Sequence, residues 1–159
     1  MAGMRDGSGD FNFEIGAWVV RHRRLKLRLA GSVDWETFGG TSRMWTVLGG
    51  AGNIEDNSLE FPGGAYRAVA LRSYDPGRSA WAIWWLSTQD PHRIDVPVTG
   101  RFDAGVGAFY AQDMLRGMPV RVRFLWLRTD TAQPRWEQAL SADGGQTWET
   151  NWTMDFDRA

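Results

Sequence analysis

The chain has 159 residues, with 18 Lys and Arg against 19 Asp and Glu, a net charge of −1 and no cysteine. This length predicts one domain with a single core, and the lack of cysteine excludes disulfides, thiolate metal sites and a cysteine nucleophile. The near-zero charge gives no electrostatic support for binding nucleic acid or an anionic membrane.

The first ten residues are polar and rich in glycine, without the apolar segment of a secretory signal. No stretch is apolar over the 18 or so residues that a membrane-spanning helix needs. We therefore expect a cytoplasmic protein with a flexible tail over residues 1–9 and one domain over residues 10–159. Asp10 is expected to cap a short helical turn over residues 11–15.

Beyond this turn, apolar and polar residues alternate with a period of two between clusters of Gly, Pro and Asp, which is typical of strands. The candidate strands are 17–29, 34–47, 51–60, 65–74, 80–88, 96–103, 107–114, 118–128, 134–141 and 147–157. About ten strands joined by short turns predict an all-β fold. We expect a single closed antiparallel up-and-down β-barrel, because closure removes the exposed edges of an open sheet.

In the first candidate strand, the large apolar residues do not all fall on the same face. Trp18 and Val20 share one parity, whereas Leu25, Leu27 and Leu29 have the other. Side chains alternate strictly between the two faces of a strand. We therefore expect a bulge or sharp bend between Val20 and Leu25.

The last two candidate strands allow us to predict which face of the sheet points into the barrel. Pairing Leu140 with Trp148 gathers most of the large apolar residues on one face with a few polar ones: Trp136, Gln138, Leu140, Trp148, Thr150, Trp152, Met154 and Phe156. Because a barrel has no core except its interior, we expect this face inside. The alternative is a polar interior formed by the opposite parity: Arg121, Arg123, Glu137 and Asn151.

The turn between these strands reads Ser141-Ala142-Asp143-Gly144-Gly145-Gln146-Thr147-Trp148. It resembles the Asp-box hairpin of sialidase-type propellers, which repeat that box in blades of about 40–50 residues each. Here the box occurs once, in a chain too short for a propeller. We expect a structural turn in which Asp143 accepts backbone hydrogen bonds and Trp148 packs into the core.

Gly16-Ala17-Trp18 opens the first strand and resembles the Gly-x-Trp motif of lipocalins and their calycin relatives. This resemblance implies that Trp18 closes one end of the barrel and that a late arginine, here Arg158, stacks across its ring. Further similarity at residues 100–102, 122–126, 135–138 and 147–152 extends the resemblance, over about residues 10–158, to uncharacterised bacterial calycin-like proteins. It implies a calycin/lipocalin-like fold and no particular activity.

Metal, cofactor and nucleic-acid sites find little support in the sequence. Asp90, His92 and Asp95 share a loop, but their spacing matches no recognised metal site. His22 is the only candidate axial ligand for a haem. The basic residues at 21–28 alternate with apolar ones, as on a solvated strand, rather than with stacking aromatics. We expect no metal, no cofactor and no nucleic-acid partner.

Large rings with a few convergent polar groups are what a small-molecule pocket needs. We expect a binding barrel for an apolar or aromatic ligand, carboxylated if Arg72 or Arg123 faces inward. The residues expected to bind it are His22, Tyr66, Arg72, Trp85, Arg123, Trp136, Gln138 and Trp152. Solid filling of the interior by tryptophan side chains is the competing interpretation.

The alternative function is a cofactor-free cyclase, isomerase or lyase of bacterial secondary metabolism that uses the same cavity. Its candidate catalytic residues are Glu137, Asp113 and Tyr110. A buried carboxylate in the cavity with a raised pKa would favour the enzyme over simple binding. The expected partner is a small-molecule ligand, with no membrane, and with a homodimer left open.

Overall fold

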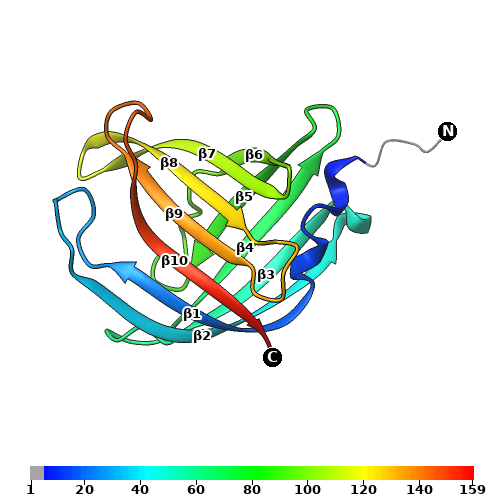
Figure 1. Cartoon of the computed structure of the whole chain (residues 1–159), viewed down its shortest axis with the longest axis horizontal. Helices are drawn as coiled ribbons and strands as arrows, with labels where there is room; N and C mark the ends of the chain where they lie inside the picture. Colours follow the sequence, from blue (N-terminus) through cyan, green and yellow to red (C-terminus); the bar gives the residue numbers. More distant parts are fainter. Residues whose placement is uncertain (1–5) are drawn as a thin grey trace.

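The structure, a computed structural model, describes residues 6–159 and forms one closed antiparallel barrel (Figure 1). Each strand pairs with its neighbours in sequence, and β1 pairs with β10 to close the ring. The strands are β1 Gly16–Leu25, β2 Trp35–Val47, β3 Gly52–Leu59, β4 Tyr66–Asp75, β5 Ala80–Ser87, β6 Val98–Asp103, β7 Val106–Leu115, β8 Met118–Leu127, β9 Arg135–Ser141 and β10 Glu149–Arg158. The predicted all-β up-and-down barrel of ten strands is confirmed.

Two short 3₁₀ turns, η1 (Gly7–Gly9) and η2 (Asn12–Glu14), cover one end of the barrel, at the right in Figure 1. Phe11 lies between them with 1% of its surface exposed, and its ring meets the rings of Trp81 and Phe102 edge-on, each at 4.9 Å. Buried apolar surface therefore fixes this segment inside the barrel end. A third 3₁₀ turn, η3 (Leu48–Gly50), joins β2 to β3.

The N-terminal segment differs in two ways from expectation. Residues 6–9, expected in a tail, are ordered, because the Gly7 amide donates to Tyr74 Oη at 3.0 Å and Trp81 Nε1 donates to the Gly7 carbonyl at 3.1 Å. The rest of that tail, residues 1–5, lies outside the described residues. Asp10 does not cap the turn that follows it. It is the C-cap of η1, where its amide donates to the Gly7 carbonyl, and η2 begins after Phe11 without a side-chain cap.

Trp18 lies at this same end of the barrel, as its motif implied. It is 2% exposed, and the Arg158 guanidinium carbon lies 3.8 Å from the centre of its ring. The indole Nε1 donates to the Glu14 carbonyl at 2.8 Å. Trp18 therefore joins η2 to both strands of the closing seam, where it stands opposite Arg158 in register.

The bulge predicted in the first strand is absent. β1 pairs without a register shift against both β2 and β10, and it ends at Leu25. The conflict of parity is resolved because the chain leaves the sheet there, so that Leu27 lies in the β1–β2 loop with 51% of its surface exposed. Arg24 consequently keeps the inward parity of Trp18 and Val20.

The bulge of this barrel lies in β10, where the register shifts between Thr150 and Trp152. The shift places Trp136 opposite Met154 and Gln138 opposite Trp152, two residues away from the expected pairing. The predicted tryptophan face does line the interior from Trp152 to Phe156 and along β9. Trp148 and Thr150 precede the bulge, however, and belong to the outer face.

The β9–β10 turn has the structural role expected of it. Asp143 accepts hydrogen bonds from the Thr147 amide at 2.9 Å and from Ser141 Oγ at 2.8 Å. Trp148 does not enter the core. It lies on the outer surface, 6.0 Å from the ring of Tyr110 and under the guanidinium of Arg123.

Replacing Asp143 with alanine is expected to lower the melting temperature, because the Thr147 amide and hydroxyl lose their acceptor. Hydrogen bonds from the side chain and amide of Thr147, followed by that from Ser141, lower the pKa of Asp143 from 3.8 to about 2. The ionised carboxylate of Asp143 therefore stabilises the fold fully at pH values above 3.8, the ordinary pKa of the group. This contribution is lost as the pH falls through about 2.

The difference in melting temperature between Asp143→Asn and the native chain should accordingly shrink between pH values of about 4 and 2. Circular dichroism melts across that range measure it. An unchanged melting temperature combined with a loss of ligand affinity would instead give the turn a binding role.

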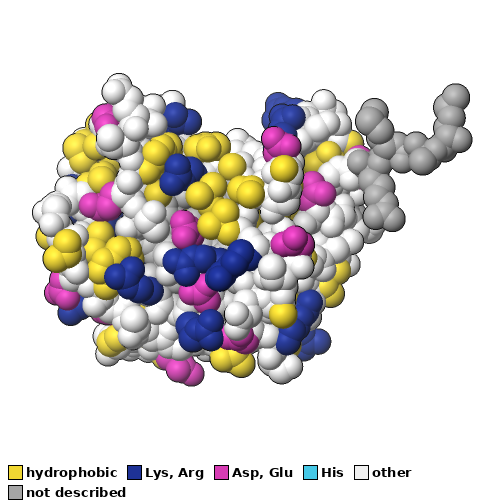
Figure 2. Space-filling view, in the orientation of Figure 1, with side chains coloured by type: hydrophobic (Ala, Val, Ile, Leu, Met, Phe, Trp, Pro, Cys, Tyr) yellow, Lys and Arg dark blue, Asp and Glu magenta, His cyan; other side chains and the backbone are white. Residues whose placement is uncertain are grey.

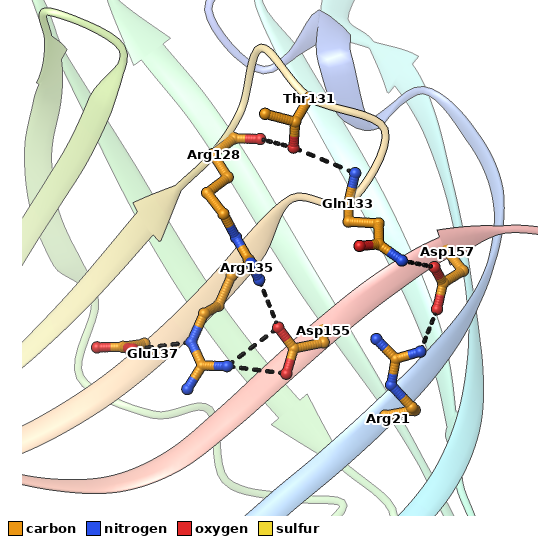
Figure 3. A network of polar contacts seen from close by, with 8 residues as sticks. All are labelled: Arg21, Arg128, Thr131, Gln133, Arg135, Glu137, Asp155 and Asp157. Atoms are coloured by element: carbon orange, nitrogen blue, oxygen red, sulfur yellow. Dashed lines mark hydrogen bonds and ion pairs between the residues drawn. The ribbon is translucent and has the colours of Figure 1, made fainter.

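The outer surface of β9, β10 and β1 carries a network of ion pairs (Figure 3). Asp155 accepts from Arg135 Nη1 at 2.8 Å and from Arg128 Nη2 at 2.7 Å, and Arg135 Nε donates to Glu137 at 2.9 Å. Figure 2 shows basic and acidic side chains intermingled over β10 and β1 on this face. Exposed pairs of this kind add little stability singly, and they show that Glu137 faces outward.

The interior has a filled half and a hollow half. Around η1 and η2 the aromatic rings pack solidly, including those of Phe109, Trp126 and Phe156. Towards the β1–β2 loop, at the left in Figure 1, the barrel is open. Within residues 6–159, no helix is long and apolar enough to cross a membrane.

Candidate functional site

Three adjoining pockets occupy the open half of the barrel. The mouth pocket, about 200 Å³, is bordered by Arg24, Arg28, Tyr66, Trp85, Gln138 and Trp152, among others. The side pocket, about 130 Å³, continues it towards Asp95 and Asp113, where β5 and β6 share only three paired residues. The floor pocket, about 20 Å³, lies deeper against Glu55 and Arg72. Trp85 and Phe124 border all three pockets.

Aromatic side chains from β5, β8, β9 and β10 form one wall of this cavity. Trp152 meets Trp85 and Trp136 edge-on, with ring centres 5.9 and 5.3 Å apart. Trp136 in turn meets Phe124 at 4.9 Å. Such perpendicular contacts hold each ring in place, so the wall is preformed for a flat apolar body.

Arg24 crosses the mouth of the cavity from the end of β1. Its guanidinium carbon lies 4.8 Å from the ring centre of Trp152, and its Nη1 donates to Tyr66 Oη at 3.0 Å. Within residues 6–159, Arg24 forms no ion pair with a carboxylate. Its remaining donors are therefore available to an anion.

Arg28, in the β1–β2 loop, borders the same pocket from above. Burial, followed by repulsion from Arg24, lowers the pKa of Arg28 to about 10, although Glu149 and Asp95 act in the opposite direction. Neither carboxylate is close enough to form an ion pair with it among the described residues. Arg24 and Arg28 thus share one half-buried site, which Arg93, Asp90 and Asp95 also border. An anion placed between the two guanidiniums would reduce their mutual repulsion.

His22 lies one layer deeper on β1 and is 3% exposed. Its Nδ1 accepts from Trp152 Nε1 at 3.1 Å, and its ring stacks on Phe38 at 4.6 Å. Burial lowers the pKa of His22 to about 4. The imidazole is therefore neutral near pH 7, with its acceptor nitrogen occupied by a protein donor.

A cluster of charged side chains lies beneath the cavity, between η2 and the barrel wall. Arg72 donates from Nη1 to Glu14 at 2.7 Å and to Asn53 at 3.0 Å, and from Nη2 to Glu55. All four side chains are at most 3% exposed. Burial dominates at Glu14 and raises its pKa well above the ordinary value. At Glu55, burial acts in the same direction, but the Arg72 charge and hydrogen bonds outweigh it and lower the pKa.

Arg72 therefore pairs with both carboxyl groups, and it holds the pKa of Glu55 down while burial keeps that of Glu14 raised. Glu55 borders the floor pocket, whereas Glu14 does not.

Six of the eight residues expected to bind ligand border the three pockets: Tyr66, Arg72, Trp85, Trp136, Gln138 and Trp152. His22 borders none of them and lies behind Trp152, from which it accepts a hydrogen bond. Arg72 faces inward, but its charge is already engaged by Glu55. Arg123 lies on the outer face, where its guanidinium carbon is 4.5 Å from the ring of Trp148.

Of the three catalytic candidates, only Asp113 reaches the cavity, in the side pocket. Tyr110 is on the outer face with 38% of its surface exposed, and Glu137 belongs to the outer ion network. The pairing of either carboxylate with Tyr110 or Arg123 inside the barrel does not occur. The interpretation of the opposite parity as a polar interior is wrong for Arg121, Arg123 and Glu137. Asn151, at the bulge, is 0% exposed, and its Oδ1 accepts from Gln138 Nε2 at 2.8 Å.

The sequence reasoning missed Arg24, Arg28 and the polar wall of β3. β3 turns Asn53, Glu55 and Asn57 inward and Ile54 outward, the reverse of what hydrophobic patterning favours. The available signal for β3 was that its three polar residues, Asn53, Glu55 and Asn57, alternate along the strand and therefore share one face. For Arg24 the signal was the inward parity of Trp18 and Val20, continued along the same strand.

No family model matches the chain, and no curated protein is similar to it in sequence. In residues 6–159, no three side chains of His, Asp or Glu gather closely enough to hold a metal ion.

Proposed function

We propose that the protein is a small-molecule-binding barrel whose ligand has an aromatic or apolar body and a carboxylate. The observation that carries this proposal is the convergence of Arg24 and Arg28 over the preformed aromatic wall, where neither forms an ion pair with a carboxylate of residues 6–159. A carboxylate at the mouth would accept from both guanidiniums, while the rings of Trp85, Trp136 and Trp152 would hold the body.

The deep part of the cavity supports binding rather than turnover. A general acid or base must face the substrate with a pKa near the working pH. The carboxylate at the cavity floor, Glu55, is held ionised by Arg72, and the carboxyl group with the strongly raised pKa, Glu14, lies outside the pockets. His22 is neutral, and its Nδ1 is already hydrogen-bonded. Asp95 borders the mouth and side pockets and burial raises its pKa, which is the feature that favours the alternative enzyme function.

The experiment compares naphthalene-2-carboxylate with the neutral isostere naphthalene-2-carboxamide by isothermal titration calorimetry. The carboxylate should bind about tenfold more tightly or better, because a hydrogen bond to a charged group contributes about 1.5–3 kcal/mol. Arg24→Gln and Arg28→Gln should each remove most of this difference and leave the affinity for the carboxamide within about threefold.

Arg123→Gln is the matched control, because it removes a guanidinium that lies beside a tryptophan on the outer face. It should bind both probes like the native chain. Equal affinity for the two probes, or an equal effect of Arg123→Gln and Arg24→Gln, would contradict the proposal.

A further inference from the structure

The floor pocket is a small, mainly apolar chamber at the buried end of the cavity. Its volume of about 20 Å³ is enough for a single water-sized group, since one such group needs about 10–15 Å³. The rings of Trp85, Trp126 and Trp136 enclose it, and Glu55 and Arg72 supply its polar border. Its polar border is therefore isolated beneath an aromatic wall.

The two polar residues at this border differ in kind: one accepts hydrogen bonds and the other donates them. The Glu55 carboxylate is an acceptor; Arg72 Nη2 donates to one of its oxygens, and side-chain hydrogen bonds with Glu14 and Asn57 also lower its pKa. Arg72, which borders the pocket as well, is a donor, and its buried Nε–H has no hydrogen-bond partner among residues 6–159. Among uncharged groups of water size, a hydroxyl both donates and accepts. It would suit this position, whereas a ketone would leave the Glu55 carboxylate without a donor and a methyl group would satisfy neither group.

The floor and the mouth are close enough for one ligand to reach both. Trp152 borders the mouth pocket and Met154 borders the floor pocket, and they lie two residues apart on β10. This corresponds to about 7 Å of strand. A bicyclic aromatic acid with its carboxylate at Arg24 would direct its far edge towards Glu55.

We propose that Glu55 and Arg72 recognise a hydroxyl group at the buried end of the ligand, so that the ligand class is the hydroxylated aromatic carboxylic acids. This inference rests on the proposed function, because it assumes that the carboxylate stays at the mouth. Glu55 is here a specificity-determining residue. Its counter-charge, Arg72, holds it ionised in the absence of ligand.

The test uses three probes that differ only at the far edge: naphthalene-2-carboxylate, its 6-hydroxy derivative and its 6-methoxy derivative. The hydroxy compound should bind at least tenfold more tightly than the parent in calorimetry. The methoxy compound lacks the donor and is larger than the pocket, so it should bind no more tightly than the parent. A crystal structure of the hydroxy complex should place the hydroxyl oxygen within hydrogen-bonding distance of Glu55.

Glu55→Gln tests the residue itself. Its amide keeps the shape and loses the charge, and Arg72 keeps its contact with Glu14 at 2.7 Å. The advantage of the hydroxy compound over the parent should fall below about threefold, while the affinity for the parent is retained. Should this variant fail to fold, the probe series on the native chain decides alone.

The possible failures are distinguishable. If the parent binds in an Arg24-dependent way but the hydroxyl adds no affinity, the inference is wrong and the proposed function stands. If the methoxy compound matches the hydroxy compound, the floor does not select a donor, and the inference is also wrong. If the parent carboxylate binds no better than the carboxamide, the proposed function fails and the inference falls with it.

Discussion

Replacing Arg72 with methionine should lower the free energy of unfolding at neutral pH by about 3–5 kcal/mol, because removing one partner leaves a buried charge without compensation. Glu55 and Glu14 would remain buried at 3% and 0% exposure with no cation beside them. Urea denaturation followed by tryptophan fluorescence measures the change.

The pH dependence of this variant follows from the same contacts. Without Arg72, burial raises the pKa of both carboxyl groups above their unfolded values. The unfolded chain then releases protons more easily than the native one, so the stability of the variant falls as the pH rises above those unfolded values. The deficit of the variant should therefore be smaller at pH of about 5 than at about 8.

Arg67→Met is the matched control. Its guanidinium also pairs with a carboxylate, Asp56 at 2.8 Å, but on the surface, with 59% of the Arg67 side chain exposed. Its loss should change stability by no more than about 1 kcal/mol. Similar effects of the two substitutions would show that the buried cluster tolerates an unpaired carboxylate and that Arg72 has no special structural weight.

Trp18→Ala should cost about 3–5 kcal/mol, the usual range for a buried aromatic side chain. The substitution empties the space between Phe156 and Arg158 and removes the indole donor to the Glu14 carbonyl. It therefore loosens η2 together with the closing seam. Denaturant unfolding provides the measurement.

Trp45→Ala is the comparison within the same sheet, because Trp45 lies on the outer face of β2 with 41% of its surface exposed. It buries less apolar area, so its removal should cost less than about 2 kcal/mol. A loss below about 1 kcal/mol for Trp18→Ala would show that the seam does not depend on this ring.

The strands were predictable because local pattern and tertiary structure agree along most of the chain. Turn residues at sites such as Asp103-Ala104-Gly105 separate the strands where the structure has them, within a few residues. The pair of Trp18 and Arg158 was implied by the calycin-like motif and is found in the structure. The same agreement placed Trp85, Trp136 and Trp152 inside.

Prediction failed where long-range contacts overrule the local pattern. The inward facing of Glu55 is possible because Arg72, on β4, and Glu14, on η2, meet it inside the barrel, and no local window of sequence contains all three. The β10 bulge at Asn151 shifts the strand by one residue without a glycine or proline to mark it. Through that shift, Trp148 moved from the expected core to the outer surface.

The seam between β1 and β10 has a consequence for folding. The cavity wall combines Arg24 from the first strand with Trp152 from the last, and the Trp152–His22 hydrogen bond spans 130 residues. Contacts this distant in sequence form late, because a large loop must close first. The proposed ligand site is therefore completed only when the ring is complete. A ligand that binds only this closed state would shift the folding equilibrium towards it in proportion to ligand concentration over Kd.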